Sequence, residues 1–306
     1  MRRLVLIGDD PHFAHTLAQA TAGLCEVVQS TSDASAPHGT EADVIAIAAA
    51  PSRPRLHLVL QSLPSGFSHF ATGIALVRAR QRGGRTLLID CALPSLSVEA
   101  LGLKAAYTLP DAARDLPRMD RLLLDAALDR HAPSGLGVLP LAGDNAQAAD
   151  QLSPADLLAL ILHLRDHFDD VIVDTGGIRN PGLIGELASH ATGIDLLCEQ
   201  TLPSVHGARS LLALAASAAC TINLVVEHHD PAILLTPAQI AETLGLPAAT
   251  VLPHARAALA NALNAGEPLV MADPGSSYGR AVAAAAGLAS AGGTPSLVAR
   301  LLGRLP

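Results

Sequence analysis

Three consecutive segments decide the fold of this chain: Leu56-His-Leu-Val-Leu60, Gln61-Ser-Leu-Pro-Ser-Gly-Phe-Ser-His-Phe-Ala71 and Thr72-Gly-Ile-Ala-Leu-Val-Arg-Ala79. They read as an apolar strand, a turn and a helix. In this context, backbone N–H groups and a lysine hold the phosphates of a nucleotide. Here the turn keeps Gly66 but has no lysine, and the only lysine of the chain is Lys104. The sequence therefore predicts a nucleotide-type scaffold without its phosphate clamp.

Short apolar runs alternate with helical patterns along most of the chain. We predict strands at Leu4–Ile7, Val44–Ala48, Leu56–Leu60, Thr86–Ile89, Gly137–Leu141, Val171–Val173, Gly193–Cys198, Ile222–Val226 and Ala248–Leu252. Helices are predicted over Ser153–Asp166, which opens with a Ser-Pro start signal, and over His206–Ala219. Apolar strands that alternate with helices are typical of a parallel sheet covered on both faces. The predicted fold class is α/β with a doubly wound, mostly parallel sheet.

The composition fits such a fold and excludes several classes of function. Hydrophobic residues make up 50% of the 306 residues and aromatic residues 2%, so aliphatic side chains must build the core. A net charge of −8 without a basic run argues against nucleic acid as a partner. The cysteines are far apart and lack metal-ligand spacing, so no metal site is expected. Because no segment resembles a signal peptide or a membrane span, we expect a cytoplasmic protein.

A segment rich in proline, serine and arginine, residues 51–55, divides the chain. We predict that it links a short α/β fragment, residues 1–50, to a larger domain, residues 56–306. Asp9-Asp10 resembles the acidic corner of a response-regulator receiver domain, but Ala48 stands where a receiver has its phosphoacceptor aspartate. We therefore interpret the fragment as a truncated receiver-like module for docking or dimerisation.

Two of the apolar runs continue into an aspartate, Asp90 and Asp174. The carboxyl ends of parallel strands form the edge where open α/β sheets bind ligands, so both carboxylates should lie near the turn at residues 61–71. Such carboxylates hold Mg²⁺ in nucleotide-hydrolysing proteins. The alternative is that each aspartate caps the turn that follows it.

His228-His229-Asp230 is the only histidine cluster that looks like a set of metal ligands. Neighbouring side chains at the end of a strand point to opposite faces, so a shared metal ion is not expected there. We interpret this cluster as part of a loop.

Five segments in this order resemble one known family. They are Gly83–Asp90, Leu122–Leu139, Phe168–Asp174, Glu199–Leu212 and Asn264–Val270. Together they resemble the MinD/ParA ATPases, whose Walker motif is deviant, and within that family the CpaE/TadZ pilus-assembly branch. The resemblance runs from about residue 55 to residue 288, and Leu122–Leu139 is its most branch-specific part.

The resemblance also shows which parts of the nucleotide site have changed. The family's "KGGVGKTT" loop falls on Pro64–Ala71, where His69 replaces the phosphate-binding lysine and Phe70 the Mg²⁺-binding hydroxyl. Ala92 replaces the second aspartate of a "D-x-D" motif, and Glu227 replaces the asparagine that contacts adenine. An ionised carboxylate cannot donate a hydrogen bond to a ring nitrogen. Histidine, with an ordinary pKa near 6.5, is an unreliable cation at neutral pH.

What the resemblance implies is a degenerate Walker A loop and a vestigial nucleotide pocket. The pocket would consist of Gly66, Ser68, His69, Asp90 and Asp174, with no catalytic residue and no metal ligand. No cofactor is expected, and ATP with Mg²⁺ is the alternative. The implied function is a non-hydrolysing scaffold or localisation factor for Tad/Flp-type pilus assembly at the inner membrane.

The same resemblance implies partners and leaves two other functions open. We expect a homodimer formed through the former nucleotide face, with Phe67 and Phe70 in the contact, and other pilus-assembly or secretion proteins as partners. The C-terminal residues 296–306 alternate apolar pairs with arginines, which predicts peripheral contact with the inner membrane, for instance at a cell pole, or packing on the body. The alternatives are a working ParA/MinD-type ATPase with an unorthodox phosphate loop, and a regulator of another envelope machine such as the flagellum or cellulose export.

Overall fold

A computed structural model of the chain describes residues 2–7, 25–30, 44–47, 54–63, 67–82, 85–104, 106–141 and 152–287. The described residues belong to two compact units, one before Pro54 and one that begins there. Asp9-Asp10, Gly66 and residues 296–306 lie outside the described residues, so the interpretations that rest on them stay predictions.

The first unit contains a small parallel sheet. Its strands are β1 (Arg2–Ile7), β2 (Cys25–Ser30) and β3 (Val44–Ile47). Their order is β2-β1-β3, and both neighbouring pairs are parallel. This is the order of the first three strands in flavodoxin-like folds, the class that includes receiver domains.

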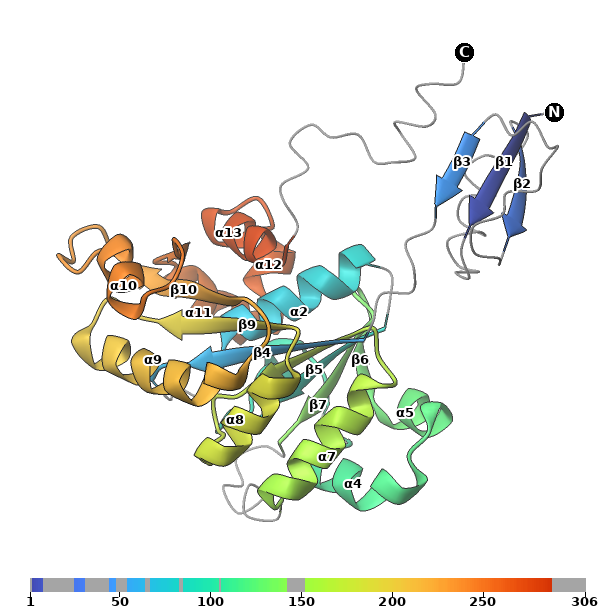
Figure 1. Ribbon diagram of the computed structural model, residues 1–306, viewed down its shortest axis with the longest axis horizontal. Helices are drawn as coiled ribbons and strands as arrows, with labels where there is room; N and C mark the ends of the chain where they lie inside the picture. Colours follow the sequence, from blue (N-terminus) through green and yellow to red (C-terminus); the bar gives the residue numbers. More distant parts are fainter. Residues whose placement is uncertain are drawn as a thin grey trace. The chain divides into compact units, whose positions relative to one another are not determined.

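The second unit is built on an eight-stranded sheet with the order β11-β10-β9-β4-β8-β5-β7-β6 (Figure 1). The strands are β4 (Arg55–Gln61), β5 (Thr86–Asp90), β6 (Asp129–His131), β7 (Leu136–Pro140), β8 (Asp170–Asp174), β9 (Gly193–Cys198), β10 (Ile222–His229) and β11 (Thr250–Pro253). All neighbouring strands are parallel except β6 and β7. The predicted doubly wound α/β fold is confirmed.

Helices cover both faces of this sheet. The helices are α2 (His69–Arg82), α3 (Ser97–Ala100), α4 (Leu109–Asp115), α5 (Arg121–Ala127), α7 (Pro154–Arg165), α8 (Pro181–His190), α9 (Leu202–Leu214), α10 (Pro237–Leu244), α11 (Arg256–Ala265), α12 (Leu269–Ala272) and α13 (Ser277–Ala285). Helices α2, α3, α11, α12 and α13 pack on one face, and α4, α5, α7, α8, α9 and α10 contribute to the core on the other (Figure 1). None of the described helices has the length and apolar character needed to cross a bilayer.

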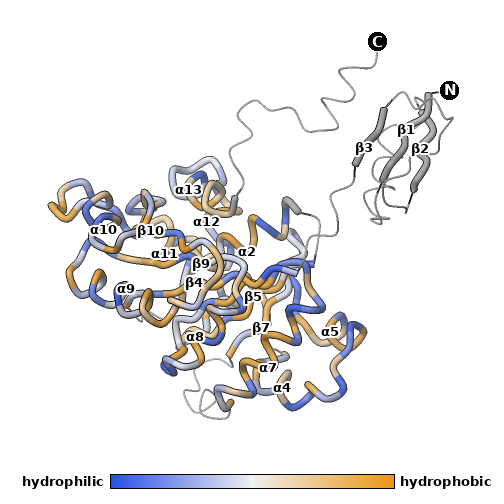
Figure 2. The backbone as a smooth tube through the Cα atoms, viewed as in Figure 1, coloured by the Kyte–Doolittle hydropathy of each residue, from blue (hydrophilic) through white to orange (hydrophobic). Residues whose placement is uncertain are grey.

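Side-chain alternation along the strands separates two hydrophobic cores. In β4, Leu56, Leu58 and Leu60 belong to the core beneath α7, α8 and α9, whereas Val59 belongs to the core beneath α2. Figure 2 shows hydrophobic residues along the central strands β4, β5 and β7. Because successive side chains of a strand point to opposite faces, a polar residue in phase with Val59 must face α2. This phase determines which polar residues meet at the ends of the sheet.

Several element boundaries differ from the sequence-based expectations. Helix α2 begins at His69, earlier than the predicted Thr72. The cluster His228-His229 belongs to β10 and is not part of a loop, because backbone pairing with β11 continues to His229. Strand β6, the antiparallel edge strand, was not predicted. By contrast, α7 begins at Pro154 behind the Ser153 cap, whose side chain accepts the N–H of Asp156, as the start signal predicted.

A polar network lies at the amino ends of the central strands, on the α2 face. Asp195 of β9 is buried, and its carboxylate contacts His57 Nε2 of β4 at 2.8 Å and accepts a hydrogen bond of 3.0 Å from Asn223 Nδ2. His57 is also buried, and its Nδ1 lies 3.4 Å from an Arg78 nitrogen. The network links strands β4, β9 and β10 to helix α2 by polar contacts inside an otherwise apolar layer.

We predict that Asp195→Ala lowers the free energy of unfolding by about 3 kcal/mol, because it leaves the buried His57 without its carboxylate partner. Urea denaturation at pH 7 measures the change. Asp166→Ala, which removes an exposed carboxylate, is the matched control and should change the value by less than about 0.5 kcal/mol. Equal effects of the two substitutions would contradict the structural role of Asp195.

Candidate functional site

The two aspartates predicted from the sequence lie side by side at the carboxyl edge of the sheet. Asp90 of β5 and Asp174 of β8 are register partners, and Asp174 is also the partner of Val59 in β4. Both carboxylates are on the α2 face and almost completely buried. The structure therefore brings Asp90 and Asp174 together, and Asp174 lies near Ser68, which directly precedes α2.

Asp174 is held by donors that surround its carboxylate. Its Oδ1 accepts a hydrogen bond of 2.8 Å from Gln61 Nε2 and one of 3.1 Å from the backbone N–H of Gly176. The backbone N–H of Ser68 lies close enough to this carboxyl group to contribute to lowering its pKa. Ser68 directly precedes α2 and caps it, because its hydroxyl accepts the N–H of Ala71 at 3.1 Å. An internal carboxylate thus lies at the helix N-terminus, the position where such folds bind an external phosphate.

Asp90 is held by the loop that follows its own strand. Its Oδ1 accepts the N–H of Ala92 at 2.9 Å, and its Oδ2 accepts the Ser95 hydroxyl at 2.7 Å and the N–H of Ser97 at 3.1 Å. Asp174 makes the corresponding bond to Gly176, two residues further along the chain. The turn-capping alternative therefore describes both aspartates.

Asp90 and Asp174 would repel each other if both carboxyl groups were ionised. Burial first, and then the charge of Asp90, raise the pKa of Asp174 well above its ordinary value, although its hydrogen bonds oppose this shift. Burial and the same two carboxylates raise the pKa of the Cys91 thiol. Among the described residues, no arginine, lysine or histidine forms an ion pair with Asp90 or Asp174. The protonated form of Asp174 is therefore favoured at neutral pH.

The loops after β5 and β8 are packed too closely to admit a ligand between them. A Cβ placed on Gly177 would lie 2.0 Å from the carbonyl oxygen of Cys91 and 3.1 Å from Leu93 Cγ. Only glycine permits this approach. Among the described residues, no group of three or more His, Cys, Asp or Glu side chains lies together as metal ligands would.

His69 does not supply the missing cation. Burial, and in second place the neighbouring His228, lower the pKa of His69 to about 4. Its ring makes an edge contact with Phe67, with the ring centroids 4.9 Å apart. At pH 7 this imidazole is neutral and can polarise a phosphate only weakly.

Phe70 corrects one expectation from the sequence. We expected Phe67 and Phe70 on a contact surface, but Phe70 is 0% exposed and belongs to the core between α2 and the sheet. Because α2 begins at His69, Phe70 and Ile74 lie one turn apart on its inner face. Only Phe67, which is partly exposed, remains at the surface.

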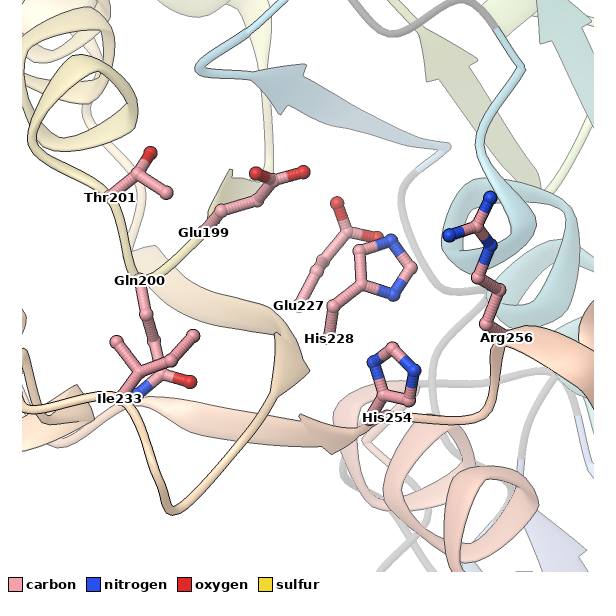
Figure 3. Close-up of a pocket in the computed structure, with 8 residues that line it drawn as sticks. All are labelled: Glu199, Gln200, Thr201, Glu227, His228, Ile233, His254 and Arg256. Atoms are coloured by element: carbon pink, nitrogen blue, oxygen red, sulfur yellow. The ribbon is translucent and has the colours of Figure 1, made fainter.

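A second group of polar residues was missed by the sequence analysis, apart from Glu227. It lines a cavity of about 340 Å³ at the carboxyl ends of β9, β10 and β11 (Figure 3). The lining residues are Glu199, Gln200, Thr201, Glu227, His228, Ile233, His254 and Arg256. Burial, followed by the charge of Glu199, raises the pKa of Glu227 to about 7. The assumption that Glu227 is ionised, and so cannot donate, therefore holds only above neutral pH.

The signal for this cavity was present in the sequence. Glu199, Glu227 and His254 each stand at or just beyond the end of a predicted apolar run, which is where parallel strands present ligand-binding side chains. The interpretation of His228 as a loop residue concealed the pattern.

The large unit has the fold of the MinD/ParA ATPases. It is similar to a ParA family ATPase from Chlorobium tepidum, with 21% identity, a TM-score of 0.68, and coverage of 76% of this chain and 98% of that one. The cell division ATPase MinD of Pyrococcus furiosus is 17% identical, with a TM-score of 0.62 and coverage of 77% and 98%. MinD in the MinC:MinD complex of Aquifex aeolicus is 17% identical, with a TM-score of 0.61 and coverage of 81% and 96%.

These likenesses establish the fold and leave the function to be argued from the site. Comparison with protein-family models and with curated proteins gave no match.

We predict that the His69 imidazole stays neutral between pH 8 and pH 5.5, because burial lowers its pKa to about 4. Proton–carbon correlation spectra of the ring, assigned with His69→Gln, measure the titration. Free imidazole added to the sample gives the reference curve. A midpoint for His69 above pH 6 would contradict the burial seen here.

We also predict that Asp174→Asn stabilises the protein by roughly 1–3 kcal/mol at pH 8, because a buried carboxyl with a raised pKa disfavours the folded state once it must ionise. The sign follows from proton binding: the folded state holds this proton more tightly than the unfolded state, so the gain should shrink as the pH falls toward 4. Urea denaturation at pH 8 and pH 5 measures it, with Asp166→Asn as an exposed control. Destabilisation at pH 8 would contradict the argument.

Proposed function

We propose that this chain is a CpaE/TadZ-like member of the MinD/ParA superfamily that works without hydrolysing ATP. Its role would be that of a scaffold or localisation factor for Tad/Flp-type pilus assembly at the inner membrane. The observation that supports the first part is the Asp174 carboxyl group, which Gln61 and Gly176 hold beside the start of α2.

The Asp174 carboxyl group occupies the space beside the start of α2 that a phosphate would need, whether it is protonated or ionised. When it is ionised it also repels a second anion, by about 4 kcal/mol for two unit charges 4 Å apart at the effective dielectric constant of a protein surface. The compensating cation of a phosphate loop is missing, because residues 54–103 contain no lysine and His69 is neutral. Phosphate binding would therefore require the Asp174 carboxyl group to move away from the start of α2.

The branch-specific segment, residues 122–139, has a structural role in the large unit. Asp125 of α5 accepts hydrogen bonds of 2.8 Å from both Arg85 and Arg130, so it joins two of the segments that carry the resemblance. Next to it, His131 Nδ1 lies 2.8 Å from the Ser134 hydroxyl in the turn between β6 and β7. Residues 130–136, Arg-His-Ala-Pro-Ser-Gly-Leu, thus belong to a small hairpin on the sheet edge, away from the nucleotide position.

The remaining parts of the proposal come from the resemblance. We expect residues 1–50 and 56–306 to act as separate modules, the large unit to form a homodimer, and residues 296–306 to touch the inner membrane. The ATPases with this fold include MinD in complex with MinC, which is an example of partner binding by the same scaffold. In our proposal the partners of this chain are components of the pilus machine.

We predict that the oligomeric state of the full chain is the same with and without Mg-ATP, because its phosphate position is filled from within. Multi-angle light scattering at several protein concentrations measures the molar mass. A shift from monomer to dimer that depends on ATP would contradict the proposal and favour a working ParA/MinD-type ATPase.

The role in pilus assembly is tested separately in the native host. Deletion of the gene should abolish surface pili. A chain with Asp174→Asn should restore them, because in this proposal the carboxylate does not bind a metal ion. Normal piliation after deletion would contradict the pilus role, and a motility or cellulose defect in its place would assign the protein to another envelope machine.

A further inference from the structure

The cavity beside β10 contains chemistry that the phosphate position does not explain. It opens between the strand ends of β9 and β11, and in Figure 3 the carboxyl groups of Glu199 and Glu227 point into the same space. His228 and His254 stand beside that space, and Arg256 lies on the far side of His228 from Glu199. In the part of the chain that the structure describes, neither glutamate side chain has an ion pair or a hydrogen bond.

A smaller cavity of about 60 Å³ extends this space inward and shares Glu199, Glu227 and His228 with it. Tyr278 of α13 lines the inner part and is only 4% exposed. Its hydroxyl has no hydrogen-bond partner among the described residues, although buried phenols usually have one. Burial and the charge of Glu227 raise the pKa of this phenol, so it stays protonated. This hydroxyl borders the inner cavity and is free to bond to a group that enters it.

The backbone at this site is strained in a way that aims side chains into the cavity. His228 has a φ of 52°, in the left-handed region that residues other than glycine rarely adopt. The register between β10 and β11 shifts between Val226 and His229, so Glu227 and His228 form a bulge. Bulges and left-handed residues of this kind re-aim side chains and are concentrated at functional sites.

The charge of the cavity selects the kind of ligand. Two carboxylates face one guanidinium, that of Arg256, across the lining. Neighbouring carboxylates that share a space disfavour full ionisation, and a cation placed between them removes this cost. Guanidinium presents parallel N–H donors that match a carboxylate on two sides, and it stacks on flat rings such as the imidazoles here.

We propose that this cavity binds a guanidinium group, held between Glu199 and Glu227 with the Tyr278 hydroxyl as an additional acceptor. The group belongs either to a small guanidine compound or to an arginine side chain of a partner peptide. The inference does not depend on the role in pilus assembly.

Calorimetry on the full chain tests the proposal with three probes: agmatine, the peptide Gly-Arg-Gly with blocked ends, and the same peptide with citrulline in place of arginine. We expect a dissociation constant below about 1 mM for at least one guanidinium probe and none measurable for the citrulline peptide. Agmatine alone would identify a small-molecule site, and stronger binding of the arginine peptide would identify a peptide site. Equal binding of the citrulline peptide, or no binding of either guanidinium probe, would overturn the proposal.

Isosteric variants locate the site. Glu227→Gln and Glu199→Gln should each weaken guanidinium binding at least tenfold, whereas Glu242→Gln on the exposed side of α10 should leave it unchanged. Tyr278→Phe removes the hydroxyl and should weaken binding less. Thermal unfolding of each variant checks that the fold is retained. Unchanged affinity in both Glu227→Gln and Glu199→Gln would place any binding elsewhere and contradict the assignment.

The pH dependence gives an independent readout. Affinity should rise between pH 6 and pH 8, because the pKa of Glu227 is raised to about 7 and the cation requires the ionised form. The titratable and charged groups that face this space are Glu199, Glu227, His228, His254, His69, Arg256 and Tyr278.

Guanosine is the final probe. Binding of guanosine without binding of agmatine would mean that the cavity binds a nucleobase, and it would overturn the proposal.

Discussion

The hydrogen bonds to the Asp174 carboxylate are the contacts on which the rest of the site depends. Through Gln61 and Gly176 they connect the end of β4 and the loop after β8 to a carboxyl group that lies beside Ser68 at the start of α2. The start of α2 therefore has a carboxyl group of its own. In a nucleotide-dependent switch, these same elements respond to an external phosphate. Here the chain itself supplies the group at this position.

This arrangement explains why the separate losses in the sequence belong together. Without a lysine in the loop, an external phosphate at the start of α2 would lack a counter-charge, and Asp174 can accept the free N–H of Ser68. Without a second aspartate at Ala92, the Asp90 carboxylate is held by its own loop through Ser95 and Ser97. The neighbouring cavity is lined by Glu199 and Glu227, which give it an acidic character.

Most strands of the large sheet could be predicted from the sequence because uninterrupted apolar runs alternate with helical patterns. The meeting of Asp90 and Asp174 also followed, since both end parallel strands at one edge. Their hydrogen-bond partners could not be predicted, because the bonds from Gln61 and Gly176 depend on the paths of the turns. Phe70 was misplaced because the start of α2 lies before the apolar period becomes evident. His228 was misplaced because backbone pairing in β10 continues where the hydrophobic pattern stops.

The central claim is that the protein fills its own phosphate position, and direct titration of Mg-ATP into the full chain tests it most directly. The account predicts no heat of binding up to about 1 mM nucleotide for the wild-type chain at pH 7.5. Micromolar binding that is abolished by Asp174→Ala would contradict it, because that result would show Asp174 serving a bound nucleotide and its metal ion.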